Sequence, residues 1–84
     1  MTTLAGEEGV GLVGNQAVNQ MISAGQRELL RDMFKTGRIP KDISAQTLKL
    51  YKELAERAIA EGKDALGVQA QRLEIIAKAL RSIK

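Results

Sequence analysis

The fold is decided by residues 44–83, which read SAQTLKLYKELAERAIAEGKDALGVQAQRLEIIAKALRSI. In the first half of this stretch, apolar side chains recur at steps of three and four residues: Leu48, Tyr51, Leu54, Ala55, Ala58 and Ile59. This spacing is typical of one face of an α-helix. Ser44 precedes the run as an N-cap, and Gly62 follows it as the residue type that ends helices in the left-handed conformation. We therefore expect an amphipathic helix between Ser44 and Gly62.

A second apolar stripe follows after a short break. Asp64 stands before it as a second N-cap, and its members are Leu66, Leu73, Ile76, Leu80 and Ile83. A connection of only a few residues makes consecutive helices near-antiparallel neighbours. The sequence therefore predicts a C-terminal helical hairpin whose two stripes face each other or share a third partner.

The preceding residues add one or two further helices. Apolar residues return at helical spacing between residues 15 and 35, and Gly25 interrupts them, so either one long helix bends at Gly25 or two helices meet there. Gly37 ends this pattern, and Pro40 then turns the chain, since proline lacks a backbone donor and keeps the residue before it out of the helical conformation. We expect an all-α fold, a small three- to four-helix bundle that forms a single domain over residues 15–84.

Residues 1–14 form a glycine-rich lead, which we expect to be flexible because ordering glycine costs backbone entropy and little apolar surface is present to offset it. Residues 9–14, GVGLVG, match the dinucleotide-binding pattern GxGxxG, and Asp32 follows at a suitable distance. That pattern binds a pyrophosphate only after a buried strand of a βαβ unit. Neither the preceding strand nor a second one is predicted, so we interpret the match as accidental.

Composition removes several classes of chemistry. The 84 residues include no cysteine and no histidine, which excludes thiolate nucleophiles and the usual zinc and haem ligands, so we expect no metal ion and no cofactor. The aromatic residues are Phe34 and Tyr51 alone, so the core must be aliphatic. No apolar run is long enough to span a membrane, and the first residues lack the pattern of a signal peptide.

The charge pattern indicates one candidate binding surface. The net charge is +3, and from residue 26 onward thirteen basic residues stand against eight acidic ones. Arg27, Arg31 and Lys35 follow one another at four-residue spacing, where like charges repel on one helix face. With Arg38 and Lys41 in the following turn, they are candidates for binding an anion such as an RNA backbone. The alternative interpretation is an ordinary solvated face, because acidic residues flank the stripe.

Two further functions stay open from the sequence. Glu28, Asp32 and Tyr51 are candidate acids and bases which, with the neighbouring cations, would make a histidine-free ribonuclease. A protein partner would instead use apolar surface left over on the hairpin, particularly Leu50, Ile75 and Ile83.

Three segments carry a resemblance to a known group of proteins. Residues 37–44 (GRIPKDIS), 50–55 (LYKELA) and 67–73 (GVQAQRL) resemble C-terminal segments of bacterial polymorphic toxins, the large secreted proteins of the haemagglutinin and Rhs type. The resemblance implies an exported bacterial effector that acts in the cytoplasm of a target cell and is neutralised by a cognate immunity protein. It implies no particular toxin activity and no site residues.

Overall fold

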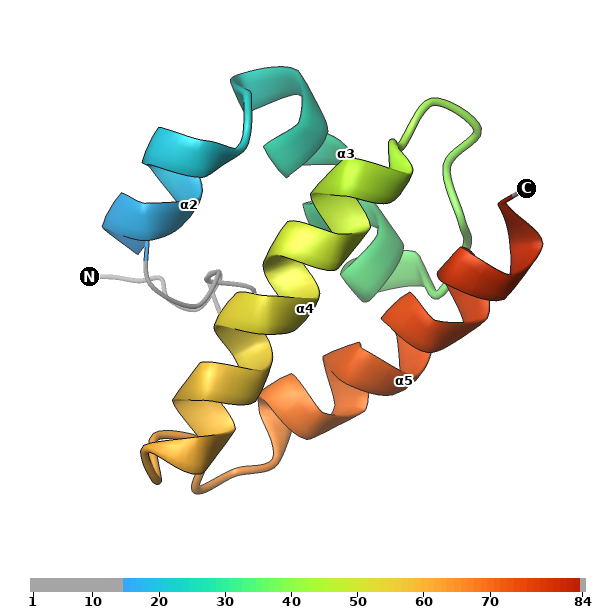
Figure 1. Ribbon diagram of the computed structural model, residues 1–84. Coiled ribbons are helices and arrows are strands. Elements are labelled where there is room, and N and C mark those ends of the chain that lie inside the picture. Colours follow the sequence, from blue (N-terminus) through green and yellow to red (C-terminus); the bar gives the residue numbers. More distant parts are fainter. Residues whose placement is uncertain (1–14, 84) are drawn as a thin grey trace.

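The computed structural model describes residues 15–83, and this part of the chain is all-helical, as predicted (Figure 1). The glycine-rich lead, with its GxGxxG match, lies outside the described residues, and so does Lys84. Within the described range the helices, in chain order, are α2 (Asn15–Met21), α3 (Ala24–Thr36), α4 (Ala45–Ala60) and α5 (Val68–Ser82). No helix within residues 15–83 has the length and hydropathy of a membrane span.

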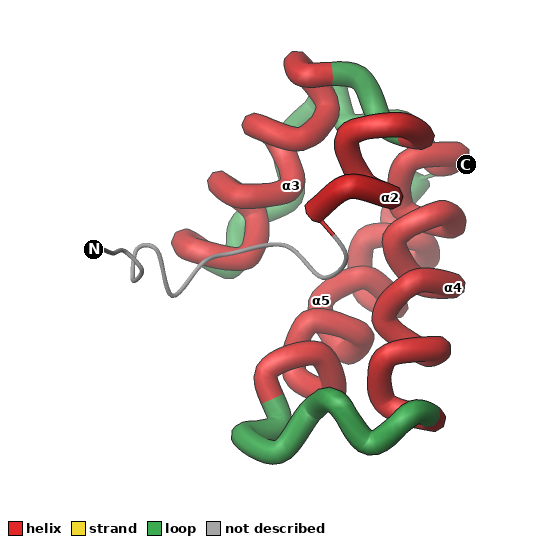
Figure 2. Tube along the Cα trace, turned by 90° about the vertical axis from the view of Figure 1, so that its left-hand side faces the viewer, coloured by secondary structure: helices red, strands yellow, loops and turns green. Residues whose placement is uncertain are grey.

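Helices α4 and α5 form the predicted hairpin, and their mutual contact is the most extensive between any two helices described (Figures 1 and 2). At the start of α4, the Ser44 hydroxyl accepts a hydrogen bond of 3.0 Å from the Thr47 N–H. At its end, Gly62 adopts a φ of 75°, and the Lys63 N–H donates to the Ala58 carbonyl at 2.9 Å. This pairing across a left-handed glycine satisfies carbonyls of the last turn. Both predicted ends of this helix are confirmed.

The start of α5 differs from the prediction in one respect. Asp64 does cap the helix, because its carboxylate accepts from the Gln69 N–H at 2.8 Å and the Ala70 N–H at 3.0 Å. Between Asp64 and the helix, however, Gly67 takes a left-handed φ of 74° and redirects the chain. Leu66 lies in the resulting turn and is 91% exposed. The placement of Leu66 on the apolar stripe was therefore wrong.

The earlier part of the chain forms two helices rather than one bent helix. The break lies at Ser23, whose hydroxyl accepts from the Gln26 N–H at 3.3 Å, and Gly25 falls inside the first turn of α3. The Gln26 side chain then reaches the far end of the α3–α4 connection. It donates to the Asp42 carbonyl at 3.1 Å and accepts from the Ser44 N–H at 2.9 Å. The starts of α3 and α4 are thereby tied together.

The core is aliphatic around one tyrosine. Its buried members are Val18, Ile22, Leu30, Met33, Ile43, Leu48, Tyr51, Ala55, Ile76 and Ala79. Leu50, Ile75 and Ile83 are partly buried against this cluster, so they do not form the leftover apolar surface that we expected on the hairpin. The exposed large apolar residues of the described range are instead Met21, Ile59 and Leu66.

Candidate functional site

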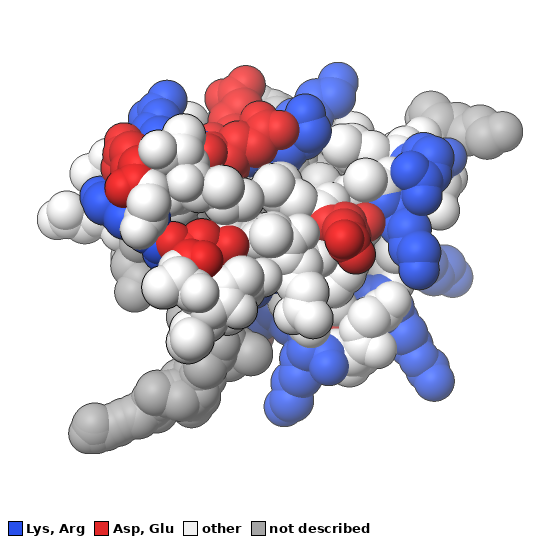
Figure 3. All heavy atoms as spheres, turned by 90° about the horizontal axis from the view of Figure 1, so that it is seen from below, with Lys and Arg blue, Asp and Glu red and all other residues white. Residues whose placement is uncertain are grey.

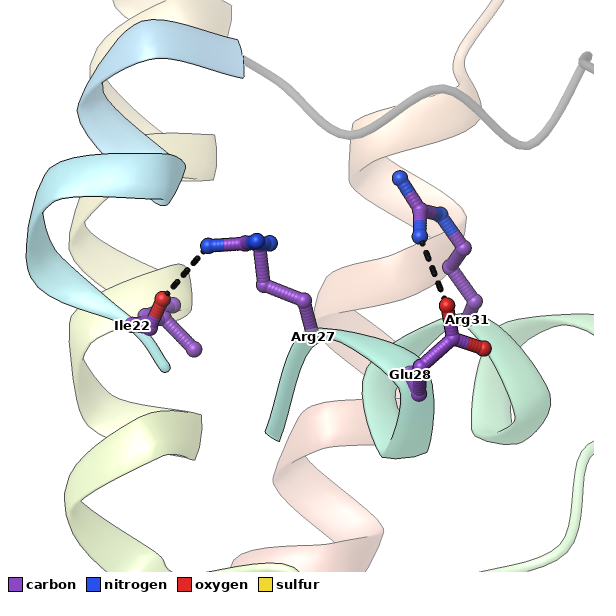
Figure 4. Close-up of polar contacts among 4 residues, drawn as sticks. All are labelled: Ile22, Arg27, Glu28 and Arg31. Carbon is purple, nitrogen blue, oxygen red and sulfur yellow. Dashed lines mark hydrogen bonds and ion pairs between the residues drawn. The ribbon is translucent and has the colours of Figure 1, made fainter. Parts of the chain in front are cut away.

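Arg27, the first member of the predicted basic stripe, points toward α2 (Figure 4). Its guanidinium donates to the Ile22 carbonyl at 2.9 Å and, over a longer 3.4 Å, to the Asn19 carbonyl. A helix leaves its last carbonyls without intrahelical partners and carries partial negative charge at this end, so a cation is favourable there. Arg27 therefore caps α2 and ties it to α3.

Arg31, the second member, forms an ion pair with Glu28 at 3.2 Å (Figure 4). The two side chains are 44% and 71% exposed, and a pair this exposed contributes little to stability. Of the three basic residues that the sequence places on one stripe, only Lys35 is both exposed and without an ion pair to another of the described residues.

Arg38 and Lys41 are also exposed, and the backbone that carries them is held at both ends. Gly37 ends α3 with a left-handed φ of 79°, and its N–H donates to the Met33 carbonyl. The Gln26 side chain holds the other end of the connection at Asp42 and Ser44. The α3–α4 connection therefore presents its two cations from a fixed position.

The C-terminal end of α5 adds two cations that the sequence did not indicate. Lys78 and Arg81 are exposed, and the last turn of α5 lies beside the α3–α4 connection (Figure 1). Helix α5 also packs against α3. We call the surface made by these five exposed side chains the basic end: Lys35, Arg38, Lys41, Lys78 and Arg81. A hint lay in the three-residue spacing of Lys78 and Arg81, which places both off the apolar stripe of α5.

The charges of the molecule are unevenly distributed. The ion pairs found between residues 15 and 83 are Arg31–Glu28, Lys52–Glu56 and Lys63–Glu61, so none involves the basic end. Figure 3 shows basic side chains gathered on the side where α5 ends, while acidic side chains lie mainly toward the α4–α5 connection. Residues 53–64, which lead into that connection, carry four carboxylates against two basic residues. The α3–α4 connection, by contrast, contains a single acidic residue, Asp42.

The three acid–base candidates do not share one surface. Glu28 and Asp32 are exposed on α3, whereas Tyr51 is fully buried. The Tyr51 hydroxyl donates to the Gln69 side-chain oxygen at 2.9 Å and accepts from the Arg72 guanidinium at 3.0 Å. Tyr51 is thus part of a buried polar cluster with Gln69 and Arg72.

That cluster joins three helices. The Arg72 guanidinium, on α5, lies over the Phe34 ring of α3 at 4.9 Å, and the Phe34 and Tyr51 ring centroids are 5.1 Å apart. Arg72 is only 5% exposed, and a buried guanidinium is tolerated where hydrogen bonds and ring faces replace its hydration. Arg72 is charged and stands one position before Leu73 of the predicted stripe, so the apolar spacing did not predict its burial.

Neither a metal site nor a family assignment emerges from the described residues. No group of three or more Asp or Glu side chains among residues 15–83 is placed to hold a metal ion. Comparison of the chain with protein-family models, curated proteins and solved structures finds no match.

Proposed function

We propose that this protein is an RNA-binding module that contacts the phosphate backbone through the basic end. The observation that carries the proposal is the gathering of five exposed cations, from the end of α3, the α3–α4 connection and the end of α5, with none of them paired to a carboxylate of residues 15–83. Phosphate contacts of this kind release counterions and supply most of the affinity of sequence-independent nucleic-acid binding.

A protein partner that docks on apolar surface has less support. Leu50, Ile75 and Ile83 pack against the core, and the exposed large apolar residues of the described range lie on three different segments: Met21 at the end of α2, Ile59 in the last turn of α4 and Leu66 in the α4–α5 connection. Single exposed apolar residues are normal on protein surfaces. The resemblance to polymorphic toxins adds an expected setting, an exported bacterial effector with an immunity protein as its second partner.

The proposal is tested by RNA binding of two charge-matched variants, measured by fluorescence anisotropy. Arg38→Glu/Lys41→Glu reverses two charges of the basic end, and Arg57→Glu/Lys63→Glu reverses two charges near the α4–α5 connection. We expect the first variant to bind labelled RNA about tenfold more weakly than the second at about 50 mM salt, and wild-type binding to fall steeply toward about 200 mM. Far-UV circular dichroism confirms that both variants remain folded.

Two results would overturn the proposal: no binding by the wild-type protein at low salt, or an equal loss in both variants, which would reflect net charge alone. The same samples also test the ribonuclease alternative. Intact RNA after incubation is expected for a binding module, whereas shortened RNA would favour cleavage, with Glu28 and Asp32 as the residues to substitute next.

A further inference from the structure

The aromatic residues of this chain are not available to stack on bases. The chain has one phenylalanine and one tyrosine. Tyr51 is fully buried, and Phe34 is partly buried with its ring between contacts to Tyr51 and to the Arg72 guanidinium. Proteins that bind single-stranded RNA rely on exposed aromatic side chains, each of which contributes about 1–3 kcal/mol by stacking on a base. The basic end can therefore contact phosphates, but it has no exposed aromatic side chain on which a base could stack.

We infer that the basic end recognises double-helical RNA by its backbone, without reading base sequence; this inference rests on the RNA binding proposed above. When attraction to phosphates is the main source of affinity, the RNA form with the highest charge density binds most tightly, and a duplex carries the charge of two strands along one axis. A duplex is also already ordered, whereas a single strand loses conformational entropy when it is held against a fixed surface.

The arrangement of the cations fits this target. They come from three segments, α3, the α3–α4 connection and α5, and so spread over one end of the molecule rather than following a single helix face. Cations spread in this way can contact phosphates of both strands of a duplex. The bases of an RNA duplex stay unread because its major groove is too deep and narrow for side chains.

The test compares a labelled RNA hairpin with an unpaired single strand of the same length, together with a second hairpin whose base pairs are exchanged. We expect the first hairpin to bind about tenfold more tightly than the single strand, and the two hairpins to bind equally. With at most five phosphate contacts, the slope of log K against log salt should not exceed about 4.5 in magnitude.

The role of α5 is tested by Lys78→Gln/Arg81→Gln, with Lys52→Gln/Arg57→Gln on α4 as the charge-matched control. The first variant should weaken hairpin binding about tenfold more than the control does. Equal or tighter binding of the single strand, or a clear preference between the two hairpins, would overturn the duplex inference while leaving RNA binding by the basic end intact. Binding of neither RNA would overturn both proposals.

Discussion

Two of the basic residues of this chain hold the fold together and are not exposed on its surface. Arg27 is used to cap α2, and Arg72 is buried among Tyr51, Gln69 and Phe34. A guanidinium suits both places because it offers several donors and a flat face that stacks on a ring. The net charge of the chain therefore overstates the positive charge that is exposed to a binding partner.

The Tyr51 hydroxyl should contribute measurably to stability. Tyr51→Phe keeps the ring that packs against Phe34 but removes the hydrogen bonds to Gln69 and Arg72. We expect the free energy of unfolding, measured by urea denaturation, to fall by about 1–3 kcal/mol, because groups left in the interior lose a partner. Leu66→Ala, at a side chain that is 91% exposed, serves as the control and should change stability by less than about 0.5 kcal/mol. A Tyr51→Phe variant as stable as the wild type would contradict this role.

At the scale of the helices, two glycines should respond to alanine in opposite directions. Gly62 ends α4 with a φ of 75°, and an added Cβ would meet nothing within 4 Å, so Gly62→Ala should cost about 1 kcal/mol of backbone strain alone. Gly25 lies in the first turn of α3, also in open space, so Gly25→Ala should stabilise by up to about 1 kcal/mol. Urea denaturation of both variants provides the measurement, and changes of the same sign would contradict this account of the helix ends.

Helix ends were predictable where the deciding contacts are local. Ser44 and Gly62 mark the limits of α4 because each acts on its own turn. The position of Leu66 was predicted wrongly because Gly67 turns the chain through a left-handed conformation, and apolar spacing cannot show that Leu66 lies before such a turn. Ile75 was placed at the surface because its burial depends on packing between helices, which the pattern of a single helix does not contain.

The candidate site was predictable to a similar extent. Lys35, Arg38 and Lys41 are close in the chain, so their common exposure follows from one helix end and one turn. The contribution of α5 comes from residues about forty positions later and depends on how the helices pack. Arg27 donates to backbone carbonyls at the end of another helix, and the spacing of side chains along the sequence cannot predict such contacts.

At the scale of the whole molecule, the single tyrosine reports on global unfolding. Tyr51 lies where α3, α4 and α5 meet, through its contacts with Phe34, Gln69 and Arg72. We expect its fluorescence and the far-UV circular dichroism to change at the same urea concentration, as in a cooperative two-state transition. A tyrosine signal that changes first would show that the centre of the bundle loosens before its helices melt.

The uneven charge distribution also has a kinetic consequence. If the protein binds RNA as proposed, the polyanion would attract the end where α3 and α5 finish and repel the carboxylates near the α4–α5 connection, so the protein would rotate into a productive orientation before the two molecules touch. Such steering raises the rate at which the two molecules meet. Dissolved salt weakens it, because mobile ions screen charges that are far apart. Added salt should then lower the association rate far more than it raises the dissociation rate.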